Sequence, residues 1–179
     1  MELLSVIASR KSIRQYQAKQ LGEQELDTVL KAACAAPVGR ALYDSMHLTV
    51  VQNPVLLKRI VAATAKVLAK DGYDALYGAP TLIIISAKRD EFLTEGLAYA
   101  NAACIAENML LAATDLGVGS VYLFTVLRGL LADKNLMKYL GLGDELKPVS
   151  SVALGYAVEP LVAGDFKKAA MKISVDRFS

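Results

Sequence analysis

Apolar residues recur at helical spacing in several stretches of the chain. From Glu23 they stand at i, i+3, i+4, i+7 and i+8, which places on one helix face Leu26, Val29, Leu30, Ala33 and Cys34. We expect this helix to end before Pro37, because proline disfavours helical backbone at the residue preceding it. The pattern predicts further helices over residues 54–70, with Asn53 as the N-cap, and over residues 92–116 and 126–142.

Short apolar runs between these helices predict strands at residues 47–52, 81–86, 119–124 and 150–158, with a fifth strand at 171–175. The run TLIIIS (81–86) is continuously apolar, which is typical of a strand buried on both faces. Strands and helices alternate after residue 47, so the pattern alone predicts an α/β domain with a mainly parallel sheet. No linker or repeat interrupts the pattern, and we expect a single domain over residues 1–179.

Composition narrows the function classes. The chain is 54% hydrophobic and 21% charged, as expected of a well-folded globular protein. A net charge of +2, a pI near 8.5 and the absence of Trp argue against a nucleic-acid partner. No apolar run approaches the roughly 20 residues of a membrane span, and the basic residues follow the apolar N-terminus, the reverse of a secretory signal. We therefore expect a cytoplasmic protein that does not contact membranes.

Four polar or glycine features admit ordinary interpretations. Cys34 and Cys104 have neither a CxxC partner nor a nearby His, so we expect buried reduced thiols and no metal site. The glycines of LGVGS (116–120) and LGLGDE (140–145) follow predicted helices, so we interpret them as helix ends rather than nucleotide-binding loops. His47 is interpreted as structural or surface-exposed. Glu107 and Asn108 are interpreted as interface or internal hydrogen-bonding groups.

The octapeptide SRKSIRQY (9–16) carries the most distinctive chemistry. In extended backbone, Arg10, Ser12 and Arg14 point to one side and Lys11 points to the other. Two guanidinium groups beside a hydroxyl can grip a phosphate, because arginine offers a planar fork of donors and serine a short neutral donor. Taken alone, the octapeptide fits a solvated run of charge better.

Four segments in order, however, resemble the nitroreductase family of flavin mononucleotide (FMN) enzymes. They are SRKSIRQY (9–16), AACAAPVGRALYDSMHLTVVQN (32–53), ACIAENMLLAATDLGVGSVYLF (103–124) and KPVSSVALGYAVEP (147–160). The resemblance implies an α+β fold of three layers, with a mixed central sheet flanked by helices. It also implies a homodimer that binds FMN at the subunit interface and exchanges its C-terminal strands. This expectation replaces the parallel sheet, because periodicity does not specify which strands pair.

The resemblance also assigns roles to residues. Arg10 and Ser12, with Lys11 between them, would hold the FMN phosphate and ribityl chain, and Arg14 would lie near the pyrimidine edge of the ring. A fixed cation there raises the flavin potential, because reduction places negative charge at that edge. Cofactor contacts are further expected from a turn of the other subunit (Pro37, Val38, Gly39), from a ring-lining segment (Tyr122, Leu123, Phe124, Thr125) and from C-terminal cations (Lys167, Lys168). No catalytic side chain is expected.

The chain departs from the family pattern at one turn. Ala41 stands where the family has an Asn that contacts the flavin, and Tyr43, Asp44 and Ser45 replace Gln-Pro-Trp. That contact is expected to be lost, or replaced by Arg40 or Tyr43.

The implied activity is hydride transfer from NADH or NADPH to FMN, followed by reduction of a small conjugated acceptor, a nitroaromatic or quinone, in a ping-pong cycle. The alternatives are a flavin-binding or storage protein with little turnover, and a specialised flavin reductase or dehydrogenase acting on another substrate. Two further alternatives are a parallel NAD-binding domain, disfavoured because no strand leads into a Gly-rich loop that opens a helix, and a non-enzymatic interaction domain.

Overall fold

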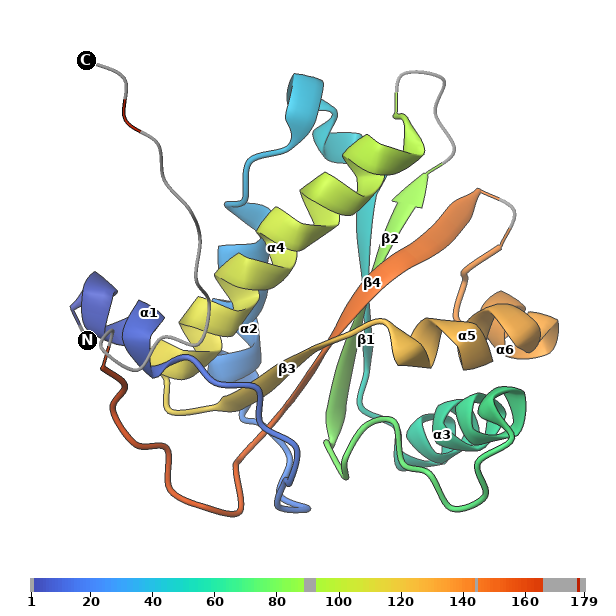
Figure 1. Cartoon of the computed structure of the whole chain (residues 1–179). Coiled ribbons are helices and arrows are strands. Elements are labelled where there is room, and N and C mark those ends of the chain that lie inside the picture. The colour runs from blue at the N-terminus through green and yellow to red at the C-terminus, as the bar shows by residue number, and fades with distance from the viewer. Residues whose placement is uncertain (1, 89–92, 144, 166–176, 178–179) are drawn as a thin grey trace.

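A central sheet of four strands in the order β1-β2-β4-β3 organises the computed structural model of the chain (Figure 1). The structure describes residues 2–88, 93–143, 145–165 and 177. The elements in chain order are α1 (Leu3–Ser9), α2 (Glu23–Cys34), the 3-10 helices η1 (Gly39–Ala41) and η2 (Tyr43–Ser45), β1 (Met46–Val51), α3 (Pro54–Leu68), β2 (Thr81–Lys88), α4 (Glu95–Asp115), β3 (Gly119–Leu123), α5 (Thr125–Ala132), α6 (Lys134–Tyr139) and β4 (Leu146–Gly155).

The sheet separates two hydrophobic cores. Ile83 and Ile85 of β2 pack with α2 and α4, whereas Leu82 and Ile84 pack with α3 and α5 on the other face. Residues 81–87 are all buried, so the predicted strand with two covered faces is confirmed. Figure 1 shows α2 and α4 on one side of the sheet and α3, α5 and α6 on the other. The result is a three-layer α+β fold.

The parallel sheet predicted from the alternation of elements is wrong. β2 pairs antiparallel with both β1 and β4, and β3 pairs antiparallel with β4. The one parallel contact that the structure describes is an isolated bridge between Ser12 and Ser120. Periodicity reports which side chains are buried, and a strand covered on both faces has the same pattern in either orientation. The α+β class implied by the family resemblance is confirmed, while the predicted strand at 171–175 lies outside the described residues.

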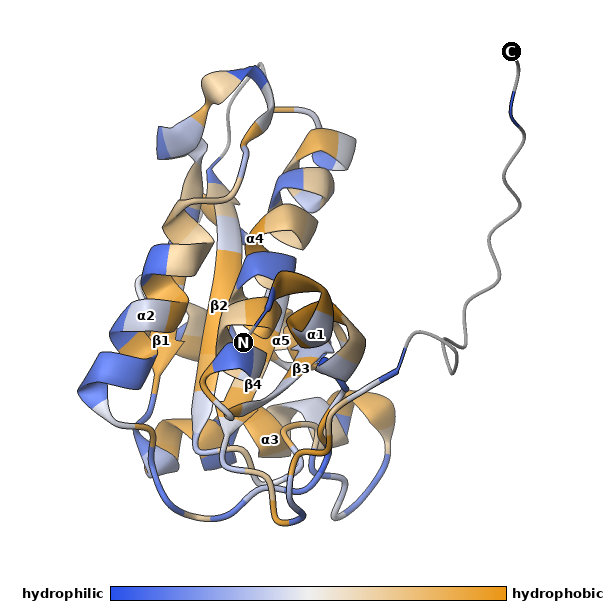
Figure 2. Ribbon diagram, turned by 90° about the vertical axis from the view of Figure 1, so that its left-hand side faces the viewer, coloured by the Kyte–Doolittle hydropathy of each residue, from blue (hydrophilic) through white to orange (hydrophobic). Residues whose placement is uncertain are grey.

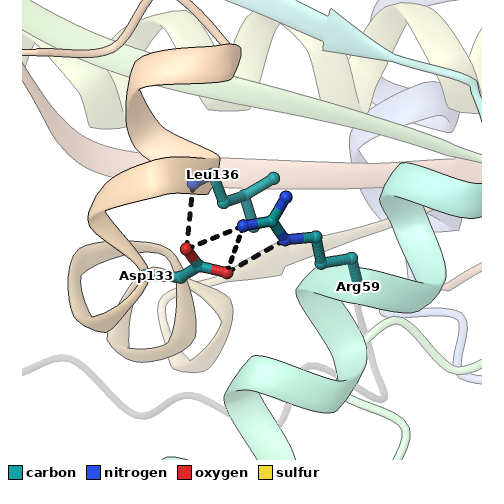
Figure 3. A network of polar contacts seen from close by, with 3 residues as sticks. All are labelled: Arg59, Asp133 and Leu136. Atoms are coloured by element: carbon teal, nitrogen blue, oxygen red, sulfur yellow. Dashed lines mark hydrogen bonds and ion pairs between the residues drawn. The ribbon is translucent and has the colours of Figure 1, made fainter.

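The helix predicted over residues 126–142 is two helices, α5 and α6, which meet at Asp133. The Asp133 carboxylate accepts a hydrogen bond from the Leu136 backbone N–H at 2.9 Å and caps α6 (Figure 3). It also accepts from Arg59 of α3, with Nε 3.0 Å from Oδ2 and Nη2 2.9 Å from Oδ1. The Leu136 N–H and then the Arg59 guanidinium lower the pKa of the Asp133 carboxyl. An N-cap inside an apolar pattern therefore ends one helix and begins the next.

Substituting Asp133→Asn should give a stability loss that depends on pH. Asparagine still caps the helix, so the variant removes mainly the charge. Because folding lowers the pKa of Asp133, its charge stabilises the fold above the unfolded pKa of about 4, and this contribution is lost as the pH falls. We expect the wild type to melt above the variant at pH 7 and the gap to narrow at pH 3. A gap that stays constant or widens on acidification would contradict this assignment.

The two cysteines differ from the expectation. Both Cys34 and Cys104 are exposed, not buried. Cys34 is the last residue of α2, and Cys104 lies on the exposed side of α4. Alanines beside them in the same helices lie on the buried face, but the two cysteines do not. Asn108 does make an internal hydrogen bond, from Nδ2 to the Ala32 carbonyl oxygen at 3.0 Å. Over the described ranges, no helix has both the length and the hydropathy needed to cross a bilayer.

Candidate functional site

Residues 10–17 form an extended segment that is fixed by backbone hydrogen bonds beside β3, one of the two edge strands of the sheet. The Ile13 N–H donates to the Ser120 carbonyl at 2.9 Å, and the Gln17 N–H donates to the Tyr156 carbonyl at 2.8 Å. Within the segment, Tyr16 is buried, while Ser12 and Arg14 are exposed. A short cationic stretch is thus held in place by its backbone, with exposed polar side chains that a ligand can reach.

A cleft of about 410 Å³ lies between residues 11–15 and residues 157–162. Its charged lining residues are Lys11, Arg14 and Glu159, so two cations face one carboxylate. Ser12 also lines the cleft, whereas the half-buried Arg10 does not belong to its lining. The structure therefore gathers Lys11, Ser12 and Arg14 around one concave surface, with Arg10 at the start of the same segment.

The chain after β4 returns to this segment. Lys11 Nζ donates to the Val162 carbonyl at 3.4 Å, and the Gly164 N–H donates to Ser9 Oγ at 3.0 Å. Residues 162–164 therefore lie beside the end of α1. Lys167 and Lys168, the predicted C-terminal cations, lie outside the described residues.

The segment predicted to line a flavin ring forms an exposed aromatic surface at the end of β3. The Tyr122 and Phe124 rings meet edge-on with centroids 5.0 Å apart, and Tyr99 of α4 lies 6.4 Å from Phe124. Phe124 is 47% exposed and Tyr99 is 38% exposed, which is unusual for rings that pack together. Leu123 is buried and Thr125 begins α5. This aromatic surface continues from the strand edge beside which Ser12 and Ile13 lie.

The turn at residues 37–41 is tightly constrained. The Gly39 N–H donates to Asn101 Oδ1 at 2.9 Å, and a Cβ on Gly39 would lie 2.5 Å from Leu97 Cδ1. Arg40 and Ala41 both have left-handed backbone, with φ of 60° and 56°. Asn101 is buried within α4, and no local pattern in the sequence distinguishes it from any other polar helical residue. Sequence analysis therefore missed the residue that holds this turn.

The structure does not bring the two parts of the predicted site together within one chain. Figure 1 shows the turn of η1 and η2 beyond one end of α4, whereas the segment after α1 lies near the other end, beside β3. Residues 10–14 and residues 122–125 thus lie along one sheet edge, and residues 37–39 lie apart from them.

A cluster of tyrosines around Arg14 was also missed. The Arg14 guanidinium carbon lies 6.0 Å from the centre of the Tyr77 ring, and Tyr77 interacts with Tyr73. Burial raises the pKa of Tyr16, whose hydroxyl donates to the Ile13 carbonyl at 2.9 Å. The stretch DALYG (74–78) has the Asp and Gly of a turn, but nothing local places its tyrosine beside Arg14.

Comparisons with known proteins, by sequence and by structure, point to one family. The sequence model of the nitroreductase family matches residues 7–156. A protein of Archaeoglobus fulgidus, named "Putative NADH dehydrogenase/NAD(P)H nitroreductase", is 31% identical over 179 residues, covering 98% of this chain and 95% of that protein. A crystal structure of a nitroreductase with bound FMN from Bacteroides fragilis superposes with a TM-score of 0.79 at 31% identity, covering 99% of this chain and all of that one. An FMN-dependent nitroreductase of Clostridium difficile R20291, at 22% identity and a TM-score of 0.79, shares the fold over 98% of this chain and 99% of its own.

Proposed function

Because the chain belongs to the nitroreductase family, we propose that it is an FMN-dependent oxidoreductase that takes hydride from NADH or NADPH. The observation that carries this proposal is the row of cationic and hydroxyl groups at residues 10–14, fixed along the same sheet edge as the aromatic surface of residues 122–125. The relatives whose names include NAD(P)H and the similar structure with bound FMN support the choice of electron donor and cofactor.

The described residues fit FMN in three respects. Arg10, Lys11 and Ser12 supply charged and neutral donors for a phosphate, and the cations that line the cleft outnumber its carboxylate. The exposed ring of Phe124, with the half-buried ring of Tyr122 beside it, offers an apolar surface to a planar group. Arg14 adds a second positive charge to the lining of the cleft. We propose that Pro37, Val38 and Gly39 of the partner subunit contact the cofactor, as the family resemblance implies. We propose cofactor contacts for Lys167 and Lys168 on the same ground.

Bound FMN would accept hydride from NAD(P)H and pass the electrons to a small conjugated acceptor, of nitroaromatic or quinone type, in a ping-pong cycle. Arg14 stabilises negative charge that develops at the pyrimidine end of the ring, since a fixed charge costs no reorganisation during the reaction. Tyr99 and Phe124 offer aromatic surface to planar substrates. We assign no side chain as a general acid or base.

We also propose that residues 1–179 act as one domain within a homodimer. Leu3 and Leu4 of α1 are 66% and 65% exposed, and Ile7 is 39% exposed. Figure 2 shows this helix as a hydrophobic ribbon at the surface of the described chain. Contiguous apolar surface of this kind marks an interaction site, and a second copy would also bring the residue 37–39 turn to the site. Exchange of C-terminal strands involves residues 166–176, which lie outside the described part of the chain, and stays a prediction.

Substituting Leu4→Glu should weaken the dimer at least tenfold, because a charge would replace a large apolar side chain at the proposed interface. Glutamate is favourable in the first turn of a helix, so the monomer should keep its fold. The matched control is Val55→Glu, which places the same charge at the second residue of α3, on a side chain that is 72% exposed. Sedimentation equilibrium should detect dissociation in the α1 variant alone. Equal dimerisation of both variants would remove α1 from the interface.

Anaerobic titration of the FMN-loaded protein with NADH and with NADPH tests the proposed activity. We expect one or both nicotinamides to bleach the flavin absorption within seconds and a quinone to restore it. Retention of FMN without reduction by either nicotinamide would indicate a flavin-binding or storage protein instead. Ala41 is the observation that favours this second function, because its methyl group cannot replace the flavin contact of the family's Asn.

A further inference from the structure

Tyr77 has a backbone conformation that aromatic residues seldom adopt. Its φ is 57°, in the left-handed region, where the Cβ of a bulky residue crowds its own backbone. Residues in this region persist only where their surroundings determine the conformation, and they gather at functional sites. The conformation of Tyr77 is therefore a reason to ask what its side chain does.

The surrounding turn holds Tyr77 firmly. The Asp74 carboxylate accepts hydrogen bonds from the Leu76 N–H at 2.8 Å and from the Gly78 N–H at 2.7 Å. The Tyr77 N–H donates to the Asp74 carbonyl at 3.3 Å, and the neighbouring Ala75 and Leu76 are buried. Because the turn is anchored on both sides of Tyr77, it fixes the direction in which the Tyr77 side chain leaves the backbone.

The fixed side chain meets Arg14. The ring centre lies 6.0 Å from the guanidinium carbon, within the range of a cation–π contact. Tyr73 interacts with Tyr77, and this side-chain interaction, more than burial, raises the pKa of Tyr73. In the described chain, Arg14 has no ion pair with a carboxylate, so the ring is the contact that orients it.

Such a contact leaves the guanidinium able to bind. An arginine that rests one face on an aromatic ring keeps its N–H groups, which point outward in its own plane, available for an acceptor. An exposed arginine without the ring would sample many rotamers and would have to be ordered when the cofactor binds. The ring thus converts a flexible cation into a preorganised one.

We propose that Tyr77 is a positioning residue that holds the Arg14 guanidinium toward the cofactor and thereby raises the reduction potential of bound FMN. This inference rests on the proposed function, because it assumes that FMN binds beside Arg14. The turn of residues 74–78 thereby tunes the reduction potential of the flavin. It does so through Arg14 and not by direct contact with the cofactor.

The test is a double-mutant cycle between Tyr77 and Arg14. Tyr77→Asn removes the ring while keeping a residue that tolerates left-handed backbone, and Tyr77→Leu serves if the asparagine variant unfolds. We expect either to reduce the preference of the protein for reduced over oxidised FMN about tenfold, which for a two-electron couple is a potential about 30 mV more negative. In an Arg14→Gln background the same substitution should have no effect on the potential. Tyr77→Phe, which keeps the ring, should retain the wild-type potential.

The potential is measured against a reference dye during slow anaerobic reduction, and the Kd of oxidised FMN by fluorescence quenching. Tyr139→Leu, at a tyrosine that is 71% exposed on α6, is the control. An unchanged potential in Tyr77→Asn, or an equal shift in the Arg14→Gln background, would overturn the inference while leaving the proposed function standing. A wild-type protein that binds no FMN would overturn both.

Discussion

Replacing Arg10 and Ser12 together by alanine should weaken FMN binding about a hundredfold and leave the fold intact. A hydrogen bond to a charged group contributes about 1.5–3 kcal/mol and a neutral one about 1 kcal/mol. The sum is near 3 kcal/mol, or somewhat more than two decades in Kd. The fold should survive because backbone groups, such as the Ile13 N–H on the Ser120 carbonyl, hold the segment in place.

Fluorescence quenching of FMN gives the Kd, and circular dichroism melting reports the fold. Lys66→Ala is the matched control, since it also removes one cation but from an exposed position on α3. The control should bind FMN as the wild type does. If the double variant binds FMN as tightly as the wild type, residues 10–12 do not hold the phosphate. Their charges would then only be solvated surface charges.

Gly129→Ala should strongly destabilise the fold although it adds only one methyl group. A Cβ on this α5 glycine would lie 2.3 Å from Thr64 Oγ1 and 2.5 Å from the Thr64 backbone nitrogen, so α3 and α5 would have to separate. The Thr64 hydroxyl cannot easily move, because it donates to the Ile60 carbonyl at 2.8 Å. Overpacking of this kind costs about 3 kcal/mol, which corresponds to a fall in Tm of roughly 10 °C for a chain of this size.

Gly96→Ala provides the control within another helix. A Cβ on Gly96 meets nothing within 4 Å, and alanine is the better helix former by about 1 kcal/mol at most. We expect its Tm to equal or exceed that of the wild type. Similar melting temperatures for the two variants would show that α3 and α5 are not packed as closely as described.

The sequence predicted well those features that depend on neighbouring residues. The helix from Glu23 to Cys34 follows from its apolar spacing, and Asn53 caps α3 as predicted, by accepting from the Val55 and Leu56 N–H groups. The segment at 10–16 could be singled out because its charges are adjacent in the chain. Such local signals need no knowledge of the remaining fold.

Features that depend on contacts between residues far apart in the sequence could not be predicted from the hydrophobic pattern. The antiparallel pairing of β2 with β4 joins segments whose burial would look the same in a parallel sheet. Asn101 reaches Gly39, and Tyr77 reaches Arg14, only after the helices and the sheet have assembled. The break at Asp133 is local, but an N-cap within a continuous apolar pattern is easily taken for a solvent-facing helical residue.

The visible absorption spectrum of the purified protein, recorded with and without added FMN after gel filtration, shows whether the chain binds FMN. We expect flavin bands that elute with the protein, because the cations at residues 10–14 and the aromatic surface at residues 122–125 together retain the cofactor. A colourless protein that elutes free of added FMN would show that the chain is not an FMN-dependent enzyme, and the charges of SRKSIRQY would then be a solvated surface.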